Sequence, residues 1–222
     1  MAAYTISKTI DDAAGTSRYY VNASGNPDNF RANRGLSTFD RPQRLTVSFN
    51  LALPNVFAKG AAPLRYAFAG WEVSGVGLAQ SGVPFSVTNS LSGQAWDGDI
   101  GSGGAGFADY VGGSLYTTGS TQARLGGYLN KAAFAAAPRT RFGTLGRNAV
   151  RGPGQANLDF SLQKRFALSE RAGLNFRTEF FNLFNRANFS NPGGSFDSST
   201  FGMISSTNAN ARIIQFGLKL TF

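Results

Sequence analysis

The chain has 222 residues, enough for one domain or two small ones, but its composition is not that of an ordinary soluble domain. Only 15% of its residues are charged, 28 are glycine and 20 are phenylalanine, and cysteine and histidine are both absent. Because no apolar stretch approaches the roughly 18 residues of a membrane helix, a helical membrane span is excluded. The net charge of +9 comes from scattered basic residues, so we expect no nucleic-acid partner.

Six segments show the alternation of apolar and polar residues that predicts β-strands with one apolar and one polar face. In chain order they are residues 3–10, 44–53, 71–87, 156–168, 172–184 and 214–222. The third segment is interrupted by Gly75, Gly77 and Gly82, which predicts bulges or a tight bend. The expected fold class is all-β, with about six meandering antiparallel strands.

The last segment has the clearest pattern, because every second residue from Ile214 to Phe222 is apolar. About ten residues is the length of a tilted strand that crosses a bilayer. An exposed strand that ends on phenylalanine would invite aggregation in a soluble protein. In an outer-membrane barrel the final strand closes against the first and its apolar face meets lipid. We therefore expect an antiparallel transmembrane β-barrel segment in the cell outer membrane.

The links between the segments alternate in length. Residues 169–171 alone separate the fourth and fifth segments, and a moderate link, residues 54–70, separates the second and third. The other three links are much longer. Such alternation is typical of a barrel with short turns at one rim and long loops at the other. If Phe222 ends in the periplasm, all the long loops are extracellular.

The polar faces of the last three segments carry charged and amide side chains that we predict to face the lumen of the barrel. A large barrel holds water or a plug in its lumen. We interpret these residues mainly as a solvated surface, with contact to a plug or a substrate as the alternative. The predicted lumen-facing residues are Asp159, Gln163, Arg177, Glu179, Gln215 and Lys219.

The sequence offers little for catalysis or for cofactor binding. Without histidine and cysteine, the common zinc, haem and Cys/His nucleophile sites are unavailable. No Gly-x-Ser-x-Gly nucleophile elbow occurs. Asp97 and Asp99 could bind calcium in a loop, but the full set of acidic ligands ending in glutamate is missing. We expect no catalytic residue, no metal and no cofactor, and we do not expect an enzyme.

Several short motifs follow one another in an order that resembles a known family. Phe-Asp-Arg-Pro-Gln-Arg-Leu leads into the second segment, and Gly-Trp-Glu-Val-Ser-Gly begins the third. Later motifs occupy residues 80–85, 142–148, 151–154, 179–185, 188–189 and 201–202, before the terminal strand. Taken in this order over residues 1–222, they resemble the carboxy-terminal end of the Oar-like TonB-dependent receptors of Gram-negative outer membranes.

The resemblance implies a barrel of about 22 strands, of which this chain supplies about the last six. It implies uptake of a large or scarce nutrient, which the sequence does not identify, driven by the inner-membrane TonB complex. No signal peptide, plug or TonB-contact segment is found, so we expect this chain to be a fragment that meets TonB only through a plug elsewhere. Outer-membrane lipid and the barrel-assembly machinery are the other expected partners.

Two sets of residues follow from the resemblance. The assembly machinery would recognise the terminal strand, because an unpaired amphipathic edge strand can be captured by strand addition. The residues of this assembly signal are Phe216, Leu218, Leu220 and Phe222. Aromatic girdles mark the two membrane surfaces of such barrels. The candidate girdle residues are Tyr4, Trp71, Phe180, Phe181 and Phe184.

Two other functions stay open at this point. A small self-contained outer-membrane barrel acting as an adhesin or surface protein would need two more strands, for which residues 106–115 and 124–134 are the candidates. A soluble all-β carbohydrate-binding domain would use the aromatic side chains as sugar platforms.

Overall fold

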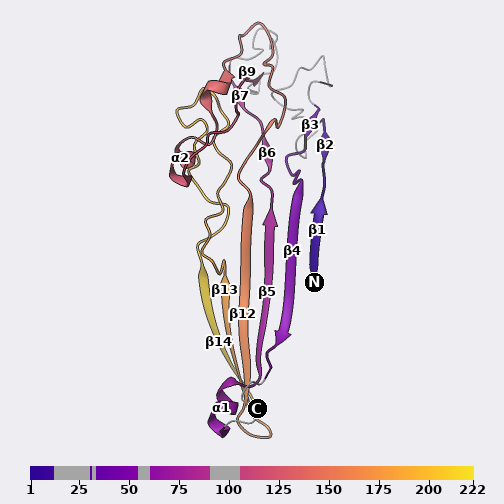
Figure 1. The fold of residues 1–222 in the computed structure, drawn as a ribbon, viewed down its shortest axis with the longest axis vertical. Coiled ribbons are helices and arrows are strands. Elements are labelled where there is room, and N and C mark those ends of the chain that lie inside the picture. The colour runs from indigo at the N-terminus through magenta and orange to yellow at the C-terminus, as the bar shows by residue number, and fades with distance from the viewer. Residues whose placement is uncertain (13–30, 32–33, 55–60, 91–105) are drawn as a thin grey trace.

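The computed structural model describes residues 1–12, 31, 34–54, 61–90 and 106–222. Its main feature is a six-stranded antiparallel sheet, in which the strands lie in the same order as in the sequence (Figure 1). The strands are β1 (Ala2–Ile6), β4 (Gln43–Ala52), β5 (Trp71–Gln80), β12 (Gln155–Ala167), β13 (Gly173–Phe181) and β14 (Ile213–Thr221). This meander confirms the all-β fold class and the six expected segments.

The sheet is open. β1 and β14 are its two edges and do not pair with each other. Each interior pair of strands has a long continuous register, for example β4 against β5 from Arg44 opposite Gln80 to Ala52 opposite Glu72. The six strands therefore form a curved wall rather than a closed barrel.

The remaining elements are short. Four two-residue strand pairs are β2 (Ile10–Asp11) with β3 (Gly35–Leu36), β6 (Pro84–Phe85) with β11 (Val150–Arg151), β7 (Thr88–Asn89) with β8 (Gly106–Phe107), and β9 (Asp109–Tyr110) with β10 (Phe134–Ala135). The helices are α1 (Ala62–Phe68), α2 (Thr121–Gly126) and the 3₁₀ helix η3 (Lys131–Ala133). No helix in the described part of the chain is long and apolar enough to span a membrane.

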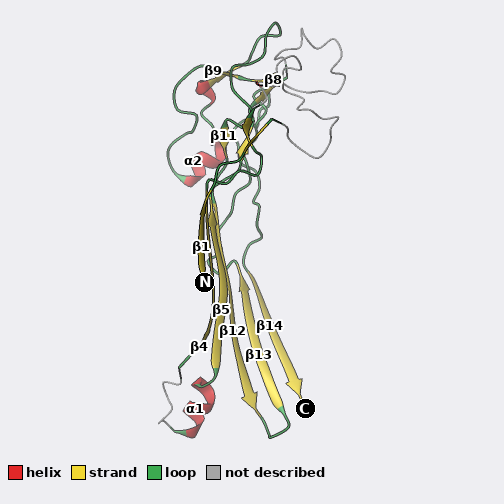
Figure 2. Ribbon diagram, turned by 90° about the vertical axis from the view of Figure 1, so that its right-hand side faces the viewer, coloured by secondary structure: helices red, strands yellow, loops and turns green. Residues whose placement is uncertain are grey.

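The described parts of the three long links lie at one end of the wall, and the described parts of the two shorter links lie at the other (Figures 1 and 2). At the short-link end, the turn between β12 and β13 is closed by a hydrogen bond from the Leu168 N–H to the Ala172 carbonyl oxygen, 2.9 Å long. The carboxy-terminus also lies at this end, as expected for a strand that ends beside the short turns. Long and short links therefore lie at opposite ends of the sheet, as the alternation of their lengths predicts.

Three expected strand ends are wrong, and so are the bulges expected at two glycines. The first strand ends at Ile6, because Ile10 pairs separately with Leu36. The third ends at Gln80 rather than at residue 87, and the fifth ends at Phe181 rather than at residue 184, because a turn follows there. Gly75 and Gly77 form no bulge, since β5 keeps an unbroken register with both neighbours through these positions.

The long links pack against one another into a structured layer beyond the sheet. We call their described parts, residues 7–12, 34–42, 81–90, 106–154 and 182–212, the loop cap. The hydrophobic core of the chain lies in this cap and not in the sheet. Its buried members are Val87, Phe107, Ala108, Tyr128, Leu129, Ala133, Phe134, Leu145, Val150 and Phe201.

The stretches that a self-contained barrel would need as strands belong to this cap. Residues 106–115 contain only the short β8 and β9, and residues 124–134 contain the end of α2, η3 and the first residue of β10. Neither stretch joins the six-stranded sheet.

Candidate functional site: a two-faced wall with a loop cap

The two faces of the wall differ in polarity along every strand. Directly opposed residues of antiparallel strands point to the same side of a sheet. One such row joins Phe49, Gly75, Phe160, Phe180 and Ile214 across five strands. The other large apolar residues on this face are Tyr4, Ile6, Leu45, Val47, Leu51, Trp71, Val73, Leu158, Leu162, Phe166, Leu174, Phe176, Phe216, Leu218 and Leu220.

Nothing in the described chain covers much of this apolar face. On β14, for example, Phe216 is 71% exposed and Leu218 is 69% exposed. A continuous exposed apolar surface marks contact with a partner or a membrane. Alternation of apolar outward and polar inward residues is the pattern of an outer-membrane barrel, whose outward face meets lipid. The sheet thus has the form of one part of a barrel wall.

The six predicted lumen-facing residues share the opposite, polar face of the sheet. Arg177 lies opposite Gln163 on one side and Gly217 on the other. In the next row, Glu179 lies opposite Ser161 and Gln215. Asp159 lies two residues before Ser161, and Lys219 lies two residues after Gly217, so their side chains point to the same face as these residues. That this face lines a lumen stays a prediction, which the register supports by bringing all six side chains to one side.

Several of these polar side chains have defined partners. Arg177 Nη2 lies 2.5 Å from Glu179 Oε1, so the pair forms an ion pair along β13. Gln163 donates to Glu72 Oε2 at 2.9 Å across to β5. Asp159 Oδ1 accepts hydrogen bonds from Asn157 Nδ2 at 2.8 Å and from the Asn182 N–H at 2.9 Å.

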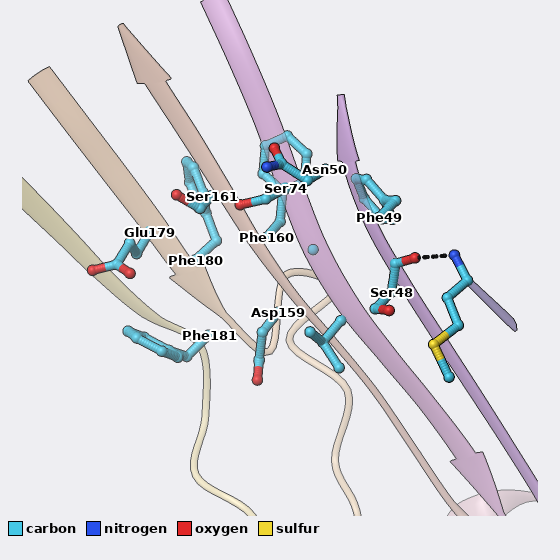
Figure 3. Close-up of a pocket in the computed structure, with 13 residues that line it drawn as sticks. Ser48, Phe49, Asn50, Ser74, Asp159, Phe160, Ser161, Glu179, Phe180 and Phe181 are labelled. Carbon is cyan, nitrogen blue, oxygen red and sulfur yellow. Dashed lines mark hydrogen bonds between the residues drawn. The ribbon is translucent and has the colours of Figure 1, made fainter. Parts of the chain in front are cut away.

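Two hollows lie on the polar face, one on each side of the Arg177–Glu179 pair. The first, of about 400 Å³, is lined by polar side chains from four strands and also by apolar ones, among them Phe49, Phe160, Phe180 and Phe181 (Figure 3). Its polar residues are Ser48, Asn50, Ser74, Asp159, Ser161 and Glu179. The second, of about 540 Å³, is more basic. Its charged residues are Glu72, Lys164, Arg165, Arg177 and Lys219. Lys164 differs from the others, because it belongs to a row of residues whose side chains point to the apolar face.

Ser161 is buried at the edge of the first hollow. Its Oγ has no hydrogen-bond partner among the described residues. A buried hydroxyl without a partner calls for water or a ligand. The hollow can therefore accept and donate hydrogen bonds, but it has no nucleophile–base pair.

The candidate girdle residues do not all lie on the same face. Tyr4, Trp71 and Phe180 are on the apolar face. Phe181 is opposite Ile213 and points to the polar face, because successive strand residues alternate. Phe184 follows β13 and is 75% exposed. Phe181 is thus not on the expected side, while the girdle role of the other four stays a prediction.

Two ion pairs and a hydrogen bond to an aspartate tie the described parts of the three long links together. Arg151 Nη2 lies 2.6 Å from Asp40 Oδ2, and Arg147 pairs with Asp11. Both pairs join the link before β4 to the link before β12. The link before β14 is joined through Asp197, whose Oδ1 accepts a hydrogen bond of 2.6 Å from the side chain of Asn89.

The electrostatics of these aspartates follow from their partners. Burial raises the pKa of Asp40, but the Arg151 guanidinium and the Thr9 N–H outweigh it, so that its pKa lies below the ordinary value. Asp11 behaves in the same way, with Ser37 and Arg147 lowering its pKa. In Asp109 the bond from Arg141 is the largest effect and lowers the pKa against the opposing effect of burial. The cap is therefore built around ionised carboxylates.

These cap contacts were not predicted as a site, although the sequence carried a signal for them. Asp40 belongs to the motif before the second segment, and Arg151 begins the motif of residues 151–154. Arg147 belongs to the motif of residues 142–148. The motifs that support the resemblance are thus the ones that contact one another in the cap.

No group of three or more potential metal ligands occurs in the described part of the chain. The segment with Asp97 and Asp99 lies outside the described residues. The expected absence of a metal, a cofactor and a catalytic residue stays a prediction.

An open antiparallel wall with an apolar outer face, a polar inner face and long loops at one rim defines a part of an outer-membrane β-barrel. Comparison with known families agrees. The chain belongs to the outer membrane beta barrel domain family, whose model matches residues 1–215. Its place is therefore the outer membrane. No curated protein and no solved structure matches the chain.

Proposed function

We propose that this chain is the carboxy-terminal part of the barrel of an Oar-like TonB-dependent receptor, and that it supplies wall and extracellular loops for the uptake of a large or scarce nutrient. The open meander is the observation that carries the proposal. Single-chain outer-membrane barrels have at least eight strands. Six strands with two unpaired edges therefore need further strands from a larger barrel.

The loop cap supports a receptor rather than a passive wall. Its buried core, two ion pairs and a hydrogen bond to Asp197 hold the described parts of three long links together at the rim opposite the carboxy-terminus. A preorganised loop surface binds a ligand at a lower entropic cost than loops that must order on binding. We therefore propose that the nutrient binds at the cap and next meets the hollows on the polar face of the sheet.

The two hollows on the polar face offer hydrogen-bonding groups to a hydrated cargo. Hydroxyl, amide and carboxylate groups share the lining of the first hollow with aromatic rings, and Ser161 Oγ there has no partner among the described residues. In a receptor of this class, such groups would contact a plug or a hydrophilic nutrient in passage. A dry, apolar cavity would instead favour a lipid-like cargo.

The proposal can be tested in cells that produce the protein. An antibody raised against residues 106–151, in the described part of the cap, is used to probe outer-membrane fractions. We expect a heat-modifiable band several times larger than the 23.5 kDa of this chain. We also expect that band to be captured by cross-linking to TonB. A band of 23.5 kDa alone, or a large band that never cross-links to TonB, would contradict the proposal.

A further inference from the structure

A hollow of about 480 Å³ lies where helix α2 of the loop cap meets the residues that precede β12 and follow β13. Helix α2 is at the cap end of the chain (Figure 1). We call this space the arginine hollow, because Arg124 and Arg186 are the charged residues among those that line it. No acidic side chain lines it in the described part of the chain. Its other lining residues are Thr121, Leu125, Tyr128, Pro153, Gly154, Ala187, Phe189 and Ile204.

The charges of the two arginines are not neutralised by the protein. Both residues are exposed. Neither guanidinium belongs to an ion pair with a described residue. A guanidinium presents several N–H donors in a planar fork that matches the oxygens of a phosphate group. Two of them at one hollow, without a carboxylate beside them, make it a surface that attracts an anion.

Both arginines are held in place by neighbouring groups. The Arg124 guanidinium carbon lies 4.9 Å from the ring centroid of Tyr128, a distance that suits cation–π attraction. The Tyr128 side chain belongs to the buried core of the cap, so this ring is fixed. The backbone of Arg186 is bound on both sides by the buried Asn182. Its N–H donates to Asn182 Oδ1 at 2.9 Å, and its carbonyl oxygen accepts from Asn182 Nδ2 at 3.0 Å. Such preorganisation lowers the entropic cost of binding.

The arginine hollow adjoins the apolar face of the wall. A neighbouring hollow of about 440 Å³ shares Gly154 and Arg186 with it. Four lining residues of that neighbour are opposed to one another across four strands and form one row of the apolar face. They are Tyr4, Leu45, Ala79 and Ala156. Because the two alanines are small, the apolar face is hollowed at this row, and Arg186 borders the hollow.

This row lies at the cap end of the sheet, since β5 ends one residue after Ala79. Long loops of outer-membrane barrels lie on the extracellular side, so we expect the arginine hollow at the level of the outer-leaflet headgroups. Basic pockets at a membrane surface bind anionic lipid headgroups. A nutrient that crosses the lumen would meet the opposite, polar face of the wall. The position of the hollow thus favours a lipid over a transported anion.

We infer that the arginine hollow binds a phosphate group of an outer-leaflet lipid, with Arg124 and Arg186 as the residues that contact the phosphate. Leu125, Phe189 and Ile204 supply the apolar side of the hollow for the less polar part of the same lipid. The inference goes beyond the proposed function, because it concerns the membrane around the barrel. It depends on the membrane location and orientation of the wall and not on nutrient uptake.

Binding can be measured on the whole protein after purification from outer membranes in detergent and removal of bound lipid. The protein is titrated by calorimetry with bisphosphorylated lipid A in mixed micelles. The same lipid A without its phosphates and inorganic phosphate are the comparison ligands. We expect the affinity for the phosphorylated lipid to exceed that for the dephosphorylated lipid at least about tenfold. Inorganic phosphate lacks the apolar contacts, so it should also bind at least about tenfold more weakly than the phosphorylated lipid.

A second comparison tests the two arginines. Arg124→Gln and Arg186→Gln each remove one of the charges at the hollow. Arg139→Gln is the matched control, because it removes an exposed charge of the cap that does not line the hollow. We expect each of the first two variants to bind the phosphorylated lipid about tenfold more weakly, and the control to lose less than about twofold. Heat-modifiable mobility on gels confirms that each variant has assembled.

Three results would overturn the inference. Equal affinity for the two forms of lipid A would show that the phosphate is not recognised. Equal affinities of all three variants, whether reduced or unchanged, would mean that the two arginines have no specific role. Inorganic phosphate that binds as tightly as phosphorylated lipid A would make the hollow a site for a soluble anion.

Discussion

Arg151 and Asp40 are 111 residues apart in the sequence, and their side chains form an ion pair of 2.6 Å that joins two long links of the cap. The Asp40 side chain is 1% exposed and that of Arg151 is 24% exposed. Arg151 also donates to the carbonyl oxygens of Asp40 at 2.9 Å and of Gly82 at 3.0 Å. One guanidinium therefore fixes the end of the first long link beside the start of the second.

Replacing Asp40 by asparagine should loosen the cap and leave the wall assembled. Removing one partner of a buried ion pair costs about 3–5 kcal/mol, because the other charge is left without compensation. Limited trypsin digestion of intact outer membranes should cut the cap of the variant much faster than that of the wild type. Asp12→Asn, at an exposed position, is the control. Equal digestion of Asp40→Asn and wild type would contradict the role of this pair.

The stability of the cap should depend on pH in a defined direction. The pKa values of Asp11, Asp40, Asp109 and Asp197 are all lower in the folded chain than their ordinary value. Their stabilisation is therefore complete above the unfolded pKa of about 4 and is lost as the pH falls through the lower folded values. Hydrogen exchange of the cap amides should show loss of protection below about pH 4, while the sheet amides stay protected.

A charge on the outward face of β14 should destabilise the barrel more than a charge on its inward face. Leu218→Arg should cost about 2–4 kcal/mol if Leu218 lies near the middle of the membrane. Gly217→Arg, one residue earlier on the polar face, should be tolerated better. Urea unfolding in lipid vesicles compares the two variants. Equal losses would show that the assignment of the faces is wrong.

Gly75 should not tolerate a side chain. A Cβ at this position would lie 2.7 Å from Cζ of Phe49 and 2.9 Å from the Asp159 carbonyl oxygen. The Phe49 ring thus covers Gly75, an arrangement in which an aromatic residue compensates for a strand glycine. Gly75→Val should cost about 1–3 kcal/mol through overpacking. Gly77→Ala is the control in thermal unfolding. A Cβ at Gly77 would lie 3.5 Å from its nearest neighbour, Cδ1 of Leu158, which is an ordinary contact distance.

The sequence predicts the wall well, because a period of two is a local property of each strand. The alternation around Leu218 and Leu220 is sufficient to assign the strand and its faces. Local patterns are less informative at strand ends. Ile10 continues the alternation of the first segment but pairs with Leu36 in the cap, and Gly75 suggests a bulge although the Phe49 ring makes a regular strand possible.

The cap could not be predicted, because its contacts join residues far apart in the sequence. No local pattern places Arg147 beside Asp11 or Arg151 beside Asp40. Helix α1 also escaped prediction, since seven residues are too few for a clear helical period. Lys164, whose ammonium group donates to the Tyr66 and Ala67 carbonyl oxygens of this helix, is a charged residue in the apolar rows of β12.

The central claim is that one face of the sheet meets lipid and the other meets water, and β4 offers the most direct test. Thr46, Val47, Ser48 and Phe49 are replaced one at a time by cysteine and exposed to a water-soluble maleimide in intact outer membranes. We predict labelling at Thr46 and Ser48, and protection at Val47 and Phe49. Labelling that does not alternate along these four positions would contradict a membrane-spanning barrel wall.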